Sequence, residues 1–183
     1  MSMLKKQKTI FLTLREEAEK RGLQIIPLKM REIPVHEGVR LKCLVPLCEF
    51  YSVCRVCPPH LPSVSEFRRA LTYFSQAFLL VLRHEAVSRE EVAKPEIALL
   101  QAVQALEKTA WQHGYYRAMG LAVGGCKLCE RCAPLNEPCR HPFQARPSPE
   151  GLGIDLTLLA RRKGLPLAWP PTGEYLLLGM LLL

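Results

Sequence analysis

The chain has 183 residues, 49% of them hydrophobic, and a formal net charge of +8 at pH 7. This length and composition allow a hydrophobic core, and they exclude a disordered chain or a small scaffold held together by disulfides. The apolar runs near the two ends are too short for a signal peptide or a membrane span, so we expect a cytoplasmic protein with no membrane contact. Its basic residues do not alternate with aromatic ones, which makes a solvated surface a better interpretation than nucleic-acid binding.

Helices and strands are predicted to alternate along the chain. A helix is expected over residues 5–21, where Gly22 ends it, and an apolar strand over 23–28. The further predicted elements are a helix starting at Ser63 or Ser65, a strand at 77–84, a helix from Pro95 to about His113, a strand at 118–123, a helix-start signal at 148–150, a helix at 156–163 and a strand at 175–183. Continuous apolar strands between helices favour an α/β fold: a small, largely parallel sheet flanked by helices, in one domain over residues 1–183.

All eight cysteines lie in two segments, 43–59 and 124–147, which are rich in proline, glycine and charge. They are Cys43, Cys48, Cys54 and Cys57 in the first segment, and Cys126, Cys129, Cys132 and Cys139 in the second. Inert buried thiols would be scattered over the apolar strands, yet the runs 77–84 and 175–183 contain none. In a reducing cytoplasm, we interpret all eight as metal ligands and not as a disulfide framework.

The second segment predicts an iron–sulfur cluster. Three of its cysteines follow each other at three-residue intervals, so that one loop can present three thiolates to a single cluster. Cys139, shortly before Pro142, suits the remote fourth ligand. A tetrahedral zinc site uses two separated C-x₂-C pairs, and three evenly spaced cysteines fit that pattern less well.

The first segment has the spacing C-x₄-C-x₅-C-x₂-C-P-P, which is less diagnostic. A second cluster is favoured there, and zinc is the alternative. A fourth ligand can also belong to the neighbouring cluster, so the assignments of Cys57 and Cys139 are open to exchange.

Other residues near the cysteines have two interpretations each. His60 and His141 could replace a thiol as ligand, but hydrogen bonding to sulfur or solvation is more typical. Gly124 and Gly125 either let the backbone approach a cluster or turn the chain out of a strand. The basic residues of these segments are Arg55, Lys127, Arg131, Arg140 and Arg146. They either offset the negative charge of the clusters or dock an acidic redox partner or an anionic substrate.

The cysteines from Cys43 to Cys57-Pro58-Pro59, GGCKLCERCA at 124–133 and PCRHPFQARPSPEGLGID at 138–155 resemble the motifs of a prokaryotic family of predicted metal-binding proteins of unknown function. The resemblance covers nearly the whole chain. It implies two cysteine groups that bind iron–sulfur clusters in anaerobic or archaeal metabolism, and it says little about what the metal does.

Three functions follow from these observations. Two [4Fe–4S] clusters held by eight thiols leave no open iron, which favours electron transfer with a redox partner protein over catalysis. An open iron would make the chain an iron–sulfur enzyme, with His141, Glu150 or Asp155 as acid–base candidates. Zinc in place of iron would make it a structural or interaction module.

Overall fold

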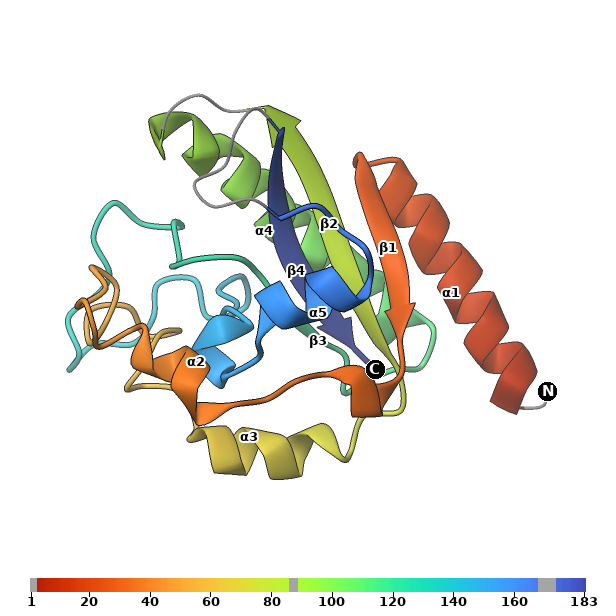
Figure 1. The fold of residues 1–183 in the computed structure, drawn as a ribbon, viewed down its shortest axis with the longest axis horizontal. Coiled ribbons are helices and arrows are strands. Elements are labelled where there is room, and N and C mark those ends of the chain that lie inside the picture. Colours follow the sequence, from red (N-terminus) through yellow and green to blue (C-terminus); the bar gives the residue numbers. More distant parts are fainter. Residues whose placement is uncertain (1–2, 86–88, 168–173) are drawn as a thin grey trace.

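The computed structural model describes residues 3–85, 89–167 and 174–183. Its four strands form one sheet in the order β1-β2-β4-β3, and each neighbouring pair is antiparallel (Figure 1). The strands are β1 (Leu23–Leu28), β2 (Ala77–Glu85), β3 (Met119–Leu121) and β4 (Glu174–Leu182). The predicted mixture of helices and strands is therefore present, but the prediction of a largely parallel sheet is wrong.

The parallel sheet was expected because two strands are continuous apolar runs. In β2 the five residues 77–81 are all buried, and in β4 the six residues 177–182 are. Such runs arise wherever both faces of a sheet are covered, and parallel sheets are the usual case. Here helices cover both faces of an antiparallel sheet, so the same pattern appears with the opposite strand direction.

Alternating side chains of β2 enter two separate cores. The helices are α1 (Met3–Glu19), α2 (Glu37–Leu41), α3 (Val64–Leu71), α4 (Arg89–Gln112) and α5 (Leu156–Arg162), with 3₁₀ turns η1 (Met30–Glu32) and η2 (Glu150–Leu152). Phe78 and Leu80 pack in the core formed with α1 and α4. Leu79 and Val81 pack in the core formed with α3 and α5 on the opposite face. This alternation follows from the two-residue period of a strand.

Most predicted elements are found, with shifted ends. Ser63 caps α3 in a capping box with Glu66, as the sequence suggested. α4 begins at Arg89, so Pro95 lies inside this helix and not at its start. The signal at 148–150 starts only the short turn η2, and α5 begins separately after its cap, Asp155. α2 and η1 were not predicted.

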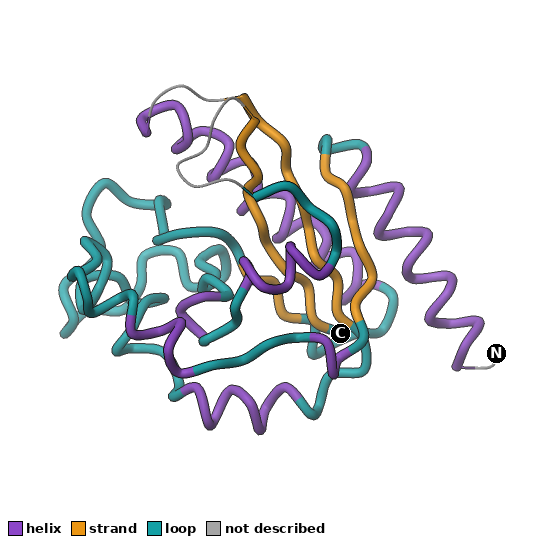
Figure 2. Tube along the Cα trace, in the orientation of Figure 1, coloured by secondary structure: helices purple, strands orange, loops and turns teal. Residues whose placement is uncertain are grey.

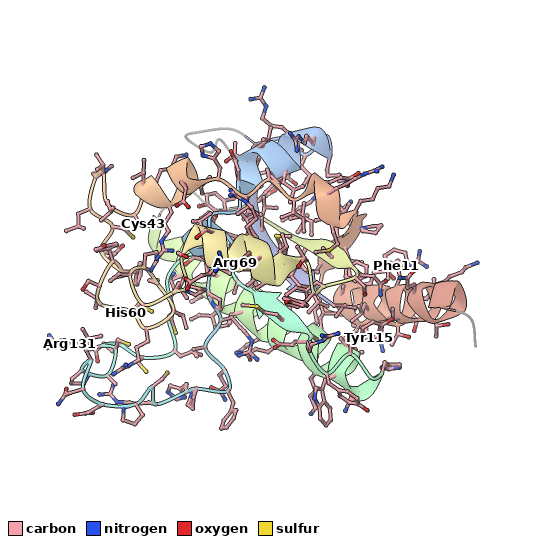
Figure 3. All side chains as sticks on the ribbon, turned by 90° about the horizontal axis from the view of Figure 1, so that it is seen from below. Phe11, Cys43, His60, Arg69, Tyr115 and Arg131 are labelled. Atoms are coloured by element: carbon pink, nitrogen blue, oxygen red, sulfur yellow. The ribbon has the colours of Figure 1, made fainter. Side chains whose placement is uncertain are left out.

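The two cysteine segments lie together at one end of the molecule. Figure 2 shows them as loops beside α2, and Figure 3 places Cys43, His60 and Arg131 at the end opposite Phe11. The first segment connects α2 to α3, and the second connects β3 to η2. None of the helices in the described ranges is long and apolar enough to cross a membrane.

Candidate metal centre

Backbone hydrogen bonds fix the places where the cysteine segments leave the fold. The amide of Ala122 donates to the carbonyl of Pro147 at 3.0 Å, which joins the two ends of the second segment. Ahead of the first segment, the amide of His36 donates to the carbonyl of Gly153 at 2.7 Å. Both segments therefore start from the same part of the scaffold, although 68 residues separate Cys57 from Cys126.

Cys54 lies beside Cys57 and Cys126 where the two segments touch. The sulfur of Cys54 accepts hydrogen bonds from the thiols of Cys126 and Cys57. These bonds stabilise the thiolate of Cys54 and hold its pKa far below its ordinary value. The same contact with Cys54, followed by burial, raises the pKa of Cys57 and of Cys126. Cys54 and Cys57 are only 2% and 7% exposed, so this sulfur group is shielded from solvent on the side of the first segment.

Further cysteines act on this group through their charge. The charges of Cys43 and Cys48 help to raise the pKa of Cys57, and the charge of Cys139 helps to raise the pKa of Cys126. Burial, and next the charge of Cys48, raise the pKa of Cys43. Six of the eight predicted ligands thus lie close enough for their charges or hydrogen bonds to shift the pKa of another. The other two, Cys129 and Cys132, are half-buried in the second segment.

All eight cysteines are free thiols. No three His, Cys, Asp or Glu side chains among the described residues converge closely enough to hold a single metal ion. Eight thiols gathered in two neighbouring loops are nevertheless a donor set that suits soft metals, zinc and iron–sulfur clusters. The chemistry of the donors therefore fits the predicted groups.

Two contacts lock one segment onto the other. Arg55, next to Cys54, donates hydrogen bonds from Nη2 to the main-chain carbonyls of Pro134 and Glu137. The ring of Phe50 lies against Gly125, where an added Cβ would come within 2.3 Å of the ring. The absence of a side chain at position 125 therefore admits the ring of Phe50. The sequence contained no local signal for either contact.

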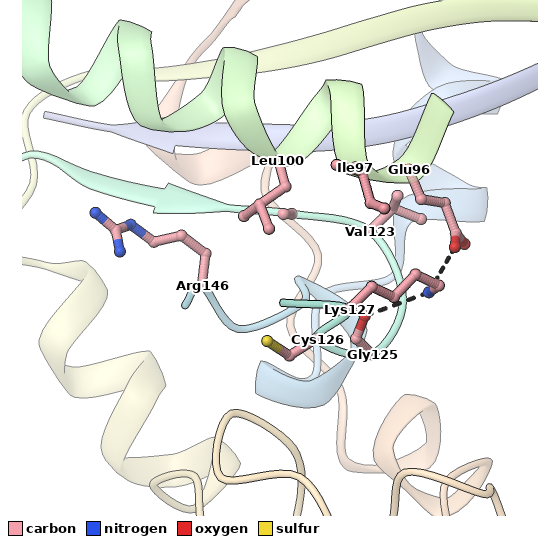
Figure 4. A pocket seen from close by; sticks show the side chains of 9 residues that line it. Glu96, Ile97, Leu100, Val123, Gly125, Cys126, Lys127 and Arg146 are labelled. Atoms are coloured by element: carbon pink, nitrogen blue, oxygen red, sulfur yellow. Dashed lines mark hydrogen bonds and ion pairs between the residues drawn. The ribbon is translucent and has the colours of Figure 1, made fainter. Parts of the chain in front are cut away.

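A small pocket lies beside Cys126, between the second segment and α4 (Figure 4). Lys127 reaches from the segment to Glu96, with Nζ 2.5 Å from the carboxylate, and also lies 5.2 Å from the centroid of the Phe50 ring. Arg146 pairs with Glu107, again at 2.5 Å. Carboxylates thus neutralise both basic side chains of this pocket, which argues against their binding an anionic substrate.

The two histidines near the cysteines have different surroundings. Nε2 of His60 lies 3.3 Å from the carbonyl oxygen of Ser52. The backbone amide of His141 donates to Sγ of Cys139 at 3.4 Å. The contact of His141 with Cys139 is thus made by its main chain and does not involve its imidazole.

The two acidic residues considered for catalysis also differ. Asp155 caps α5, because its Oδ1 accepts the amide of Leu158 at 2.8 Å. Glu150 is held with its Oε2 shielded from solvent and without a hydrogen-bond partner among the described residues. Burial raises the pKa of Glu150, and the nearby Ser148 and Lys42 oppose this shift. Asp155 thus has a structural role, and Glu150 is the one acidic candidate placed near a cysteine, Cys43.

The fold and this site define a cysteine-rich α/β protein in which two loops bring soft metal ligands together. The chain belongs to the family described as predicted metal-binding protein (DUF2284), whose model matches residues 26–183. That range contains all eight cysteines, and it confirms the family resemblance drawn from the sequence motifs. The chain matches no curated protein and no solved structure.

Proposed function

We propose that the eight cysteines bind two [4Fe–4S] clusters and that the protein transfers electrons to or from a partner protein in the cytoplasm. The observation that carries this proposal is the presence of eight free thiols in two loops that contact each other. When every thiol is a ligand, no iron is left open for a substrate. A carrier is therefore favoured over a catalyst.

Bound clusters would supply one-electron oxidation and reduction. The chain's own residues would set the surroundings of the metal. Cys54 and Cys57 hold their sulfurs away from water, and the amide of His141 offers a hydrogen bond to Cys139. Burial and hydrogen bonds to sulfur are two of the means by which a protein tunes a cluster potential.

The surface around the cysteines supports a docking role. It carries exposed apolar side chains, and these are Leu41, Leu44, Val45, Leu47 and Val53 near the first segment and Leu135 and Phe143 in the second. Phe143 is 89% exposed and Val45 75%. Arg131 and Arg140 are exposed in the same region. Exposed apolar side chains together with Arg131 and Arg140 would suit an acidic redox protein, whose charge would complement the arginines.

Metal analysis after anaerobic purification tests the proposal. We expect about eight iron and eight acid-labile sulfide per chain, a brown colour, and an EPR signal that appears on reduction with dithionite and accounts for one electron per cluster. A colourless protein without iron would refute it.

Zinc is the second candidate, and the contact of the Cys54 thiol with two others favours it, because zinc draws its thiolates close together around one ion. The protein would then be a structural or interaction module whose loops depend on metal for their shape. Two zinc and no iron per chain in the same analysis would decide for this function.

A further inference from the structure

We propose that Arg55 is the counterion of the metal centre that Cys54 helps to hold. Its guanidinium would balance negative charge on the metal and its thiolates, and its Nε–H would donate a hydrogen bond to one of the sulfurs. The inference rests on the proposed function in one respect, that metal binds to the cysteines. It adds which residue favours the reduced state of a cluster.

The first step is to separate the five basic residues of the two cysteine segments by their surroundings. Lys127 and Arg146 are already paired with carboxylates of α4. Arg131 and Arg140 are exposed, so water screens their charges. Arg55 is half-buried, and none of the ion pairs among the described residues includes it. It is therefore the basic residue of these segments whose charge is both shielded from solvent and unpaired.

The second step concerns what the guanidinium of Arg55 still lacks. Its Nη2 donates to the main-chain carbonyls of Pro134 and Glu137, which are neutral acceptors and leave the positive charge unbalanced. Its Nε is shielded from solvent and has no hydrogen-bond partner among the described residues. Burying an unpaired charge and an unused donor costs free energy, so buried groups of this kind normally have an acceptor. An anionic acceptor would satisfy both requirements.

The third step is that a metal bound by cysteines supplies such an acceptor. Four thiolates outnumber the positive charges of Zn²⁺ or of an oxidised [4Fe–4S] core, so either centre is an anion with sulfur on its outside. Cys54 directly precedes Arg55 and is only 2% exposed. The hydrogen bonds to the second segment keep the guanidinium where the two cysteine loops meet. Arg55 is thus held beside the ligands by contacts that do not use up its charge.

The consequence is a higher reduction potential. Reduction adds one electron from the reductant to the cluster and makes the centre more negative, so a fixed positive charge nearby favours the reduced form. Removing the charge of Arg55 should therefore lower the potential. Water admitted by a loosened loop would stabilise the added negative charge and would raise the potential instead. The sign of the shift thus separates the charge of Arg55 from its role in holding the loops together.

An anaerobic redox titration of the metal-loaded protein, followed by absorbance and EPR, tests the proposal. In Arg55→Met the ratio of reduced to oxidised cluster at a given potential should fall roughly tenfold for one cluster, which is about 59 mV for a one-electron couple. Arg55→Lys keeps the charge and should stay close to the wild type. Arg68→Met is the matched control, because Arg68 is exposed and also donates to a main-chain carbonyl, that of Val35. It should leave the ratio unchanged.

Two results of this titration would overturn the proposal. One is a potential in Arg55→Met that is unchanged or raised. The other is a fall in Arg55→Lys as large as that in Arg55→Met, which would mean that the charge is not what acts on the cluster.

A second measurement uses the unaltered protein and does not depend on how the variants fold. In a crystal structure of the metal-loaded wild type, Nε of Arg55 should lie within hydrogen-bonding distance of a ligand sulfur or a cluster sulfide. A guanidinium paired with a carboxylate, or an Nε turned to solvent, would overturn the proposal.

Zinc without iron would refute the proposed function and still leave the role of Arg55 open to measurement. A zinc centre with four thiolates is also an anion, so Arg55→Met should bind zinc roughly tenfold more weakly than Arg55→Lys in competition with a chelator. Equal affinities would overturn the inference.

Discussion

Phe50 occupies the space that a side chain at Gly125 would need, and so each cysteine segment constrains the sequence of the other. Gly125→Ala would place Cβ 2.3 Å from the ring and force the two loops apart. Overpacking of this kind costs about 1 to 3 kcal/mol. We expect lower stability in urea denaturation and a reduced metal content.

The double variant Phe50→Ala with Gly125→Ala provides the control for this prediction. Removing the ring should relieve the clash, so the double variant should retain more metal than Gly125→Ala alone. Equal metal loss in both would show that the contact does not limit the packing of the loops.

Arg55→Met should loosen the hold of the first segment on the second. The substitution keeps a long apolar side chain and removes the guanidinium that donates to Pro134 and Glu137. Hydrogen bonds from a charged group contribute about 1.5 to 3 kcal/mol each when well formed, and partial exposure reduces that value. We expect faster loss of metal to a chelator, followed by absorbance. Arg131→Met, an exposed residue of the second segment, should leave that rate nearly unchanged.

The ion pair between Glu32 and Lys163 predicts a loss of stability in acid. Nζ of Lys163 lies 2.7 Å from the carboxylate, and this bond, with the Lys29 amide, lowers the pKa of Glu32 from 4.5. A lowered folded-state pKa stabilises the fold above the unfolded pKa, and that contribution disappears as pH falls through the folded-state value. The difference in melting temperature between wild type and Glu32→Gln should therefore shrink below about pH 4.5. A difference that stays constant through this range would contradict the prediction.

Charge reversal tests the docking surface. Arg131→Glu should slow reduction by an acidic flavodoxin, used as a probe, by roughly tenfold at low salt, because attraction between opposite charges speeds encounter. Raising the ionic strength should slow the wild-type reaction as well. Lys8→Glu, at an exposed position of α1, is the matched control and should change the rate little. Stopped-flow absorbance measures the reduction rates of the wild type and of the two variants. Equal rates for Arg131→Glu and Lys8→Glu would count against this docking surface.

The sequence predicts the fold well where local signals decide it. The apolar run that becomes β1 ends at the predicted residues, and Ser63 begins α3 through a capping box. Strand direction is not a local property. The apolar runs of β2 and β4 report burial on both faces, and burial alone does not distinguish parallel from antiparallel neighbours.

The sequence likewise predicts only part of the candidate site. Spacing identifies the cysteines, because ligands within one loop must lie a few residues apart. The contact of Cys54 with Cys126 joins residues far apart in the chain and depends on how the loops leave the sheet. Arg55 also bonds to carbonyls about eighty residues away, and main-chain acceptors have no sequence signature. The contacts between the two segments therefore required the structure.

The sheet order has a consequence for biosynthesis. β4 is the last of the four strands in the chain, yet it lies between β2 and β3 and connects them. Until β4 inserts, β3 has no strand partner among the described residues, and the second cysteine segment that follows it lacks a fixed base. We therefore expect the four cysteines of the second segment to be positioned for metal only late in folding, after β4 has inserted beside β3.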